Sequence, residues 1–271
     1  MACAFSLTRK EINRTCFTDE DAKEKELLHR NQYKTVKEAL VLFQNDELES
    51  NPGSKYGYTT HGFTVLSAVL EGAADGKAFE KQVKELTKEL GMHDTQLDLN
   101  LPLIANRSRY YYRKPNSVLV NVPEVDNSYK WAGGGLLSTV SDLLVFGNAV
   151  LYSYQSDPSA VPKPLLKSTT VRHFWTPALD KERGYGLGWV AEPRSEINGP
   201  KSRPWNRTNF FYHTGGAVGA TSILLIKPND GKEADGHPSG VCVSILINLQ
   251  NASHGLLPLA QNIAQAFDAS P

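Results

Sequence analysis

The order of the hydrophobic patterns constrains the fold of this 271-residue sequence more than any other feature. Residues 210–213, 222–226 and 241–248 are short runs of mostly apolar residues with turn signals between them, and they predict three strands. Apolar residues before them follow helical spacing, and residues 254–267 predict a closing helix. Helices first and strands last predict an α+β domain, in which helices pack on one antiparallel sheet.

Several helices are expected before the strands. Thr18 with Asp21 resembles a capping box, from which a polar helix is predicted to run to about Phe43. Further helices are predicted around residues 63–70 (short and largely buried), over 79–90 with Gly91 as its stop, and from Thr139, which forms a capping pattern with Asp142. Residues 96–130 and 153–170 are expected to be irregular, and 185–190 to form a further strand.

Charge and composition exclude some partners. The 29 basic and 29 acidic residues cancel, so no net field attracts nucleic acid or an anionic membrane. Apolar residues make up 40% of the chain, but the longest apolar runs are too short to span a bilayer. The N-terminus meets charged residues early and shows no targeting peptide. The three cysteines do not suggest a disulfide framework.

The motifs of several cofactor classes are missing from the sequence. No two of the seven histidines lie within five residues of each other, so no local pair has zinc-ligand spacing. There is no phosphate-binding loop motif, and Gly184-Tyr-Gly-Leu-Gly188 lacks the dinucleotide-binding register. We therefore expect neither a metal nor a cofactor.

Two short stretches are candidates for catalytic or binding residues. Tyr58-Thr59-Thr60 follows a Pro-Gly turn and precedes a helix, and His213-Thr214-Gly215-Gly216 follows a strand. Taken singly, the tyrosine is more simply a packing residue, and the His-Thr-Gly segment is more simply a turn into the next strand.

The two stretches gain weight from the motifs between them. P-G-x-x-x-x-Y-x-T-x-G-F, L-G-M-H-D-T, A-G-G-G-L-x-S-T, Y-G-L-G-W and H-T-G-G occur in one order along the chain. From about residue 25 onward, the sequence thereby resembles the serine beta-lactamase-related family, which includes class C beta-lactamases and D-Ala-D-Ala carboxypeptidases. The resemblance implies a beta-lactamase/transpeptidase-like fold. We expect a tail over residues 1–24 and a partial domain over 25–271, mainly helical over 25–180 and carrying strands and the closing helix over 181–271.

The family's reaction is acyl transfer through a serine ester. The resemblance implies a general acid/base at Tyr58, an oxyanion N–H at Gly216, and substrate-binding roles for Thr60, His213, Thr214 and Gly215. His213 stands where relatives carry lysine; a histidine is mostly neutral at pH 7, so it would grip a carboxylate less firmly. The expected substrates are therefore peptides or esters rather than penicillins.

The family's nucleophile motif, S-x-x-K, is absent from these 271 residues. Ser6 and Lys10 could share a helix face, but an N-terminal tail is the simpler interpretation. Ser138 follows the glycines, where a helix-entry residue is the simpler interpretation. We therefore expect a chain that lacks the first strands and the nucleophile helix and is inactive alone. A non-catalytic binding or assembly protein on the same fold, and an enzyme that uses Ser6 or another serine, remain alternatives.

The resemblance also bears on assembly and location. In this fold the last strand, here residues 241–248, pairs with the first strand of the chain. If that strand is missing, residues 241–248 present an unpaired apolar edge, which favours self-association. The resemblance further implies a mitochondrial location and a link to lipid metabolism or peptide hydrolysis.

Overall fold

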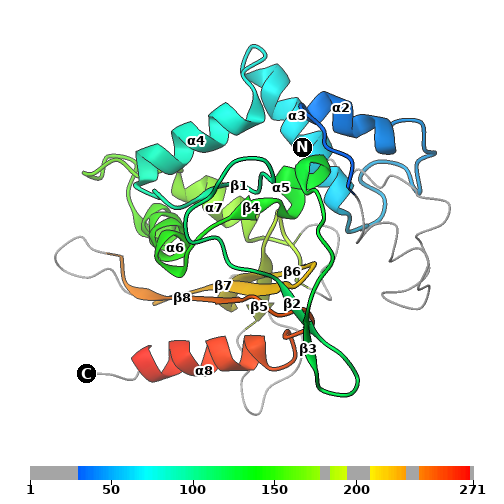
Figure 1. Cartoon of the computed structure of the whole chain (residues 1–271). Coiled ribbons are helices and arrows are strands. Elements are labelled where there is room, and N and C mark those ends of the chain that lie inside the picture. Colours follow the sequence, from blue (N-terminus) through cyan, green and yellow to red (C-terminus); the bar gives the residue numbers. More distant parts are fainter. Residues whose placement is uncertain (1–29, 178–183, 194–207, 230–237, 269–271) are drawn as a thin grey trace.

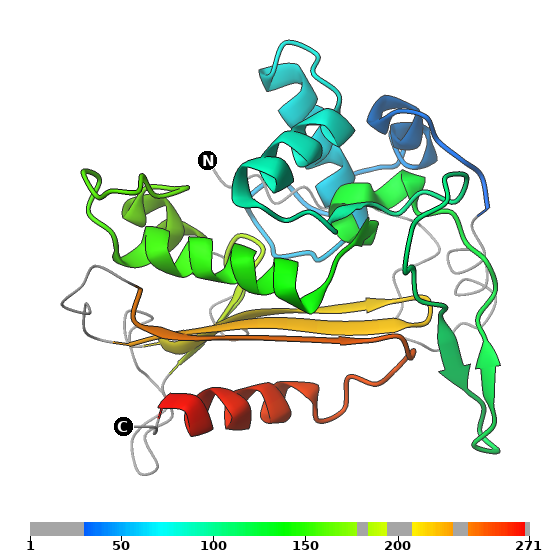
Figure 2. The ribbon, with the colours of Figure 1, turned by 60° about the vertical axis from the view of Figure 1, so that its left-hand side comes forward.

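The computed structural model describes residues 30–177, 184–193, 208–229 and 238–268. A four-stranded antiparallel sheet lies at its centre, with helix α8 on one face and α6 and α7 on the other (Figures 1 and 2). The remaining helices α2, α3, α4 and α5 lie beyond α6 and α7, so the described part of the chain is layered as the predicted α+β class requires.

The sheet has the order β5-β6-β7-β8. Its strands are β5 (Val190–Pro193), β6 (Thr208–Ala217), β7 (Ala220–Pro228) and β8 (Gly240–Ile247). The three predicted strands are confirmed: β6 and β7 extend beyond their predicted ends, and β8 begins and ends one residue earlier than predicted. The strand predicted over residues 185–190 is wrong, because the chain at Gly184 and Gly188 takes positive φ angles and turns before β5 begins.

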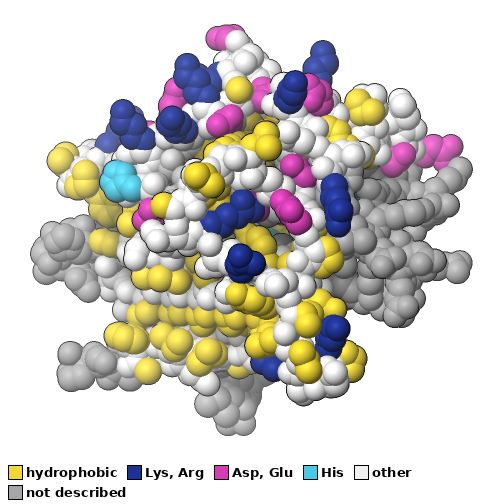
Figure 3. All heavy atoms as spheres, viewed as in Figure 1, with side chains coloured by type: hydrophobic (Ala, Val, Ile, Leu, Met, Phe, Trp, Pro, Cys, Tyr) yellow, Lys and Arg dark blue, Asp and Glu magenta, His cyan; other side chains and the backbone are white. Residues whose placement is uncertain are grey.

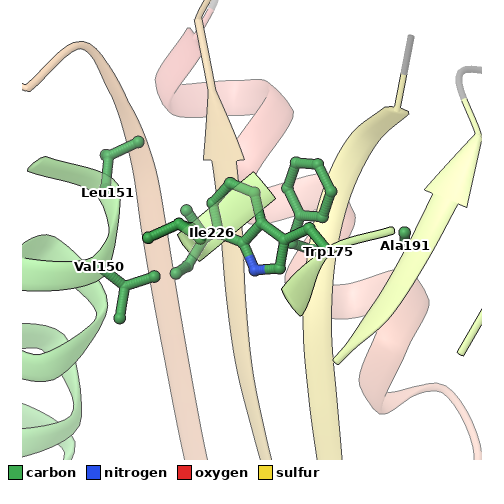
Figure 4. Close-up of a cluster of buried hydrophobic side chains, with 7 residues drawn as sticks. Val150, Leu151, Trp175, Ala191 and Ile226 are labelled. Atoms are coloured by element: carbon green, nitrogen blue, oxygen red, sulfur yellow. The ribbon is translucent and has the colours of Figure 1, made fainter. Parts of the chain in front are cut away.

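One hydrophobic core lies between the sheet and helices α6 (Val140–Gln155) and α7 (Ser168–Phe174). Trp175 stacks on Phe211 of β6, with ring centroids 3.7 Å apart, and its indole lies among the side chains of both helices and the sheet (Figure 4). The other buried residues of this core are Val150, Leu151, Val171, Ala191 and Ile226. This core fixes the strand that carries His213.

A second core lies on the opposite face of the sheet, under α8 (Leu256–Asp268). Ile223 and Leu225 of β7 are fully buried there against the helix residues Leu256, Ala260 and Ala264. The alternation of side chains along β7 sends neighbouring residues to the two cores. The closing helix predicted over residues 254–267 is confirmed, with its start two residues later.

The helices before the sheet match the sequence in part. Helix α4 (Phe79–Leu90) ends at Gly91, which takes the left-handed conformation, as predicted. Helix α6 begins with the Thr139 side chain accepting a hydrogen bond from the Asp142 N–H, also as predicted. Helix α3 (Thr60–Ala73) is present, but it is not largely buried: Leu66, Val69 and Leu70 are each at least 43% exposed.

Of the long polar helix predicted up to Phe43, the described part of the chain has only the end, over residues 36–42. Residues 30–35 are not helical, and α2 (Val36–Ala39) begins only after Thr35, whose side chain caps Glu38 N–H. A short 3-10 turn, η1 (Leu40–Leu42), follows it. The Tyr33 N–H instead donates to Ser128 Oγ at 2.8 Å, so a tertiary contact replaces the helical bond. The capping pair Thr18 and Asp21 lies outside the described residues.

The segments predicted to be irregular contain short elements. Within residues 96–130 these are β1 (Gln96–Leu97), the hairpin of β2 (Tyr111–Arg113) with β3 (Leu119–Asn121), and η2 (Ser128–Lys130). Just after this segment come α5 (Trp131–Gly134) and β4 (Leu136–Leu137), which pairs with β1. The hairpin projects beside the sheet (Figure 2). Within residues 153–170, only the middle is irregular, because α6 continues to Gln155 and α7 begins at Ser168. Strands of two or three residues carry too little periodicity to be recognised in a sequence.

Candidate active site

Tyr58 lies in the segment that enters helix α3. The segment turns at Gly53, whose φ of +79° favours glycine, and ends at Thr59, which caps α3 by accepting a hydrogen bond from His61 N–H. The cap fixes the chain next to Tyr58, whose side chain remains 53% exposed. Partial burial raises the pKa of the Tyr58 hydroxyl above its usual value, so the group is a phenol at neutral pH.

His213, Thr214, Gly215 and Gly216 lie within strand β6, not in a turn after it. The turn into β7 comes later, at Val218 and Gly219. Gly215 faces Ser222 across the ladder, and a Cβ on Gly215 would come within 2.2 Å of the Ser222 hydroxyl. A side chain on Gly215 would therefore require the Ser222 hydroxyl to turn away, while Thr214 and Gly216 are exposed.

Strand β5 pairs with β6 only as far as Tyr212, which lies opposite Val190. In the described part of the sheet, His213 to Ala217 therefore pair with β7 alone. An extended substrate could reach backbone groups of Thr214 and Gly216 from the edge that β5 does not cover, and the ring of Tyr58 lies close to this part of β6, at the ring of His213.

The fold brings Tyr58 and His213 together from distant parts of the sequence. Their ring centroids are 6.4 Å apart, and the ring of Tyr185 lies 5.8 Å from Tyr58 and 5.9 Å from His213. The Tyr185 hydroxyl is 3.1 Å from Nε2 of His213, and Tyr56 packs on the other side of Tyr185 at 5.4 Å. These four residues, Tyr56, Tyr58, Tyr185 and His213, are called the aromatic cluster below.

The aromatic cluster has an unusual electrostatic character for a catalytic site, since no formal charge is among its members. Burial lowers the pKa of His213, a hydrogen bond to the Thr214 backbone partly offsets this, and the imidazole is neutral at pH 7. Burial also raises the pKa of Tyr185, and the nearby Tyr58 and Tyr56 hydroxyls raise it further. The cluster thus offers phenolic hydroxyls and a neutral ring to a substrate.

Tyr185 was missed as a site residue by sequence reasoning. Its motif, Y-G-L-G-W, was interpreted as a strand. The signal that could have found it is the pair of glycines on either side, because Gly184 has a positive φ and a Cβ on Gly186 would lie 2.1 Å from the Phe174 carbonyl oxygen. Such close backbone packing indicates a turn held in one position, which aims the tyrosine between them.

Thr60 begins helix α3 and lies against the A-G-G-G segment. A Cβ on Gly133 would be 2.8 Å from the Thr60 carbonyl oxygen and 3.0 Å from its Cβ, whereas a Cβ on Gly134 would meet nothing within 4 Å. The first glycine is therefore required for α5 to approach the helix that follows Tyr58. A contact of Thr60 with substrate stays a prediction.

We expect Gly133→Ala to lower the free energy of unfolding by about 1–3 kcal/mol, because the new methyl group must push α5 away from Thr60. Gly134→Ala is the matched control and is expected to stay within about 0.5 kcal/mol of the wild type. Urea unfolding followed by circular dichroism measures both. Equal losses in the two variants would contradict the close approach.

Ser138, one of the two serines considered as nucleophiles, has a structural role. The Ser138 hydroxyl is hydrogen bonded to Thr95 Oγ1 at 2.8 Å, and Thr95 donates to the buried carboxylate of Asp142 at 2.7 Å. This chain of bonds joins the start of α6 to the segment after α4, which is a structural role. Ser6 lies outside the described residues.

Among the described residues, no group of three or more His, Cys, Asp or Glu side chains could hold a metal ion, and no helix is long and apolar enough to cross a membrane.

The sheet with helices on both faces, together with a tyrosine beside an H-T-G strand, defines a protein of the class that contains beta-lactamases and penicillin-binding proteins. The profile of the family described as Beta-lactamase matches residues 16–266, and the chain belongs to this family. This confirms the predicted family and the predicted beta-lactamase/transpeptidase-like fold.

Three proteins illustrate the relationship. The chain is 38% identical to "Serine beta-lactamase-like protein LACTB, mitochondrial" of Bos taurus over 277 residues, which is 96% of this chain and 49% of that protein. It is also 38% identical to the Homo sapiens protein of the same name, covering 96% of this chain and 50% of the relative. A penicillin-binding protein from Bacillus halodurans superposes with a TM-score of 0.69 at 17% identity, over 96% of this chain and 70% of the other, and shows the shared fold. The chain spans about half the length of these curated relatives.

Proposed function

We propose that this chain carries the proton-donating and substrate-binding part of a serine acyl-transfer site that hydrolyses peptide or ester substrates. The observation that supports it best is the meeting of Tyr58 with the H-T-G strand at His213, since the two motifs lie far apart in the sequence. Membership of the Beta-lactamase family supports the same reaction class. In this proposal Tyr58 is the general acid/base and acts chiefly as the acid, because its pKa is raised and a phenol donates its proton to the leaving group.

The backbone at Gly216 supplies one oxyanion N–H in this proposal, and Thr60, Thr214 and Gly215 contact the substrate. The exposure of Thr214 and Gly216 on an edge that β5 does not cover supports these roles. The neutral aromatic cluster favours an uncharged acyl group. A carboxylate would lose its hydration there without gaining a cationic partner from the cluster. Peptides and esters are therefore favoured over penicillins.

The attacking group is the missing part of this proposal. No S-x-x-K occurs in the 271 residues, and a phenol with a raised pKa cannot replace it as a nucleophile at neutral pH. We infer that the 271-residue chain by itself is inactive, and that hydrolysis requires a serine supplied by further sequence of the native protein.

Fluorophosphonate labelling of two samples tests this function. The recombinant 271-residue chain is expected to remain unlabelled. Native protein from its own source is expected to have an intact mass well above 29.9 kDa and to label, and to cleave uncharged esters faster than penicillins. The measurements are intact mass spectrometry and labelling before and after heat denaturation, which controls for non-specific reaction.

Two outcomes would contradict the proposal. Labelling of the 271-residue chain that disappears in Ser6→Ala would place the nucleophile at Ser6 instead. A native mass of 29.9 kDa without labelling would mean that the protein acts without a nucleophile.

The location is proposed from likeness. The bovine, human and mouse relatives carry the word mitochondrial in their names, and we propose the same compartment for this protein. A link to lipid metabolism is a further proposal from the family resemblance. Fractionation of cells that express the native protein checks the location.

Assembly is the second candidate function, and the edge of the sheet supports it. Strand β8 bonds to β7 along its length, whereas the described contacts on its other side lie just after the strand, where Asn248 and Gln250 bond the backbone of Tyr111 and the Asn248 side chain donates to the Arg109 carbonyl. Residues Gly240–Ile247 carry no charge, and hydrophobic side chains form a band at this level of the surface (Figure 3). An uncharged strand edge favours pairing with another strand, which supports self-association.

A further inference from the structure

The aromatic cluster contains a hydrogen bond that the proposed chemistry does not use. The Tyr185 hydroxyl lies 3.1 Å from Nε2 of His213, although Tyr185 belongs to the turn before β5 and His213 to β6. Leu187 N–H donates to the Phe174 carbonyl and Gly186 N–H to the Trp189 carbonyl, so the backbone on this turn is held firmly. The fold therefore holds Tyr185 next to His213.

The direction of this bond follows from the chemistry of the two groups that it joins. The Tyr185 hydroxyl lies 3.1 Å from Nε2 of His213, and at neutral pH it keeps its proton. A neutral imidazole has one N–H and one nitrogen with a lone pair, and that nitrogen is a stronger acceptor than a phenolic oxygen. The phenol is therefore assigned as the donor and Nε2 as the acceptor, which leaves the ring proton on Nδ1.

We propose that Tyr185 is a specificity-determining positioning residue, whose hydroxyl donates to Nε2 of His213 and holds the imidazole as the neutral Nδ1–H tautomer. This inference rests on the proposed function, because it assigns the substrate preference of that site to a particular residue. With Nε2 occupied, His213 cannot present a cationic N–H to a substrate carboxylate. The ring becomes a neutral wall beside Thr214 and selects uncharged acyl groups.

The surroundings of the pair agree with this role. Within the described part of the chain, the groups that act electrostatically on Tyr185 are the hydroxyls of Tyr58 and Tyr56, and no lysine, arginine or carboxylate is among them. The rings of Tyr56 and Tyr58 pack on Tyr185 at 5.4 and 5.8 Å, and both partners of the bond are partly buried. A phenylalanine at position 185 keeps this packing and removes only the donated proton.

Nitrogen-15 NMR of the histidine rings of the 271-residue chain tests the proposal. His213 is assigned by the signals that disappear in His213→Gln. At pH 8 we expect a protonated Nδ1 and an unprotonated, hydrogen-bonded Nε2. In Tyr185→Phe we expect a mixture of both tautomers and an upward shift of the His213 titration midpoint, because the neutral ring loses its donor.

Tyr152→Phe is the matched control, since it removes a tyrosine hydroxyl that bonds only the exposed Pro162 carbonyl, and it is expected to change neither signal. A proton on Nε2 in the wild type, or a Tyr185→Phe spectrum identical to the wild type, would overturn the proposal. The wild-type spectrum decides the tautomer even if the variant does not fold. The NMR result needs no nucleophile, and fluorophosphonate labelling needs no tautomer, so the inference and the proposed function can fail separately.

Discussion

Asp98→Ala is expected to lower the free energy of unfolding by about 3 kcal/mol, the low end of the range for a broken buried ion pair. The Asp98 side chain is 4% exposed and lies 2.6 Å from the Arg107 guanidinium. It also accepts a hydrogen bond from Asn127 Nδ2 at 2.7 Å. Removing the carboxylate leaves both donors without this acceptor, and the loss is limited because Arg107 remains 25% exposed and keeps the Leu99 carbonyl.

The Asp98–Arg107 ion pair also supports the candidate active site. The Asp98 N–H donates to the Gly135 carbonyl at 2.8 Å, and Gly135 lies at the end of helix α5. Gly133 of the same helix packs against Thr60, so the ion pair helps to hold the structure next to Thr60. Glu85→Ala is the control, because the Lys77–Glu85 pair is also short, at 2.8 Å, but exposed, and its loss is expected to be much smaller than that of Asp98→Ala. Urea unfolding compares the two. If Asp98→Ala cost no more than Glu85→Ala, the ion pair would not be a structural anchor.

Trp175→Ala is expected to destabilise the protein by about 3–5 kcal/mol, which is the usual loss when a buried tryptophan becomes a cavity. Trp175 is 3% exposed and stacks on Phe211, with an interplanar angle of 10°, and also contacts Trp189 and Tyr154. A loss of this size should lower the melting temperature by about 10 °C in a domain of this length. Differential scanning calorimetry measures it.

Trp175→Phe separates packing from hydrogen bonding at the same position. The indole N–H of Trp175 has no hydrogen-bond partner among the described residues, so phenylalanine loses ring volume but no polar contact. We expect a clearly smaller loss than for alanine. Equal losses in the two variants would show that the flat stack on Phe211 contributes little and that the core relaxes around position 175.

Much of the fold could be predicted from local signals. The helix over residues 79–90 has apolar residues at helical spacing and a glycine at its end, and the three strand runs are separated by turn residues. The length of the helix that ends near Phe43 was overestimated. The Tyr33 N–H bonds to Ser128, and no local sequence pattern predicts that this distant residue lies nearby. The hairpin β2–β3 was missed because three residues are too few to show a period.

The candidate site divides in the same way. Tyr58 and His213 were found from the order of motifs, which the sequence contains, and the structure brings them together. Tyr185 was missed because its role depends on a hydrogen bond to a strand 28 residues away. The H-T-G segment was placed in a turn, because its glycines suggest one, whereas the structure places it within β6, where Gly215 lies opposite Ser222 of β7.

The sequence by itself determined the family, the α+β class, the identity of the tyrosine and H-T-G motifs, and the absence of S-x-x-K from these residues. These properties depend on residue type and spacing along the chain. Only the tertiary structure decided that Tyr185 meets His213 and that, among the described residues, no charged side chain acts on Tyr185 and no strand pairs with the β5 side of β6 beyond Tyr212. The physical reason is that hydrogen bonding, burial and strand pairing depend on which distant residues become neighbours, and periodicity along one chain does not record that.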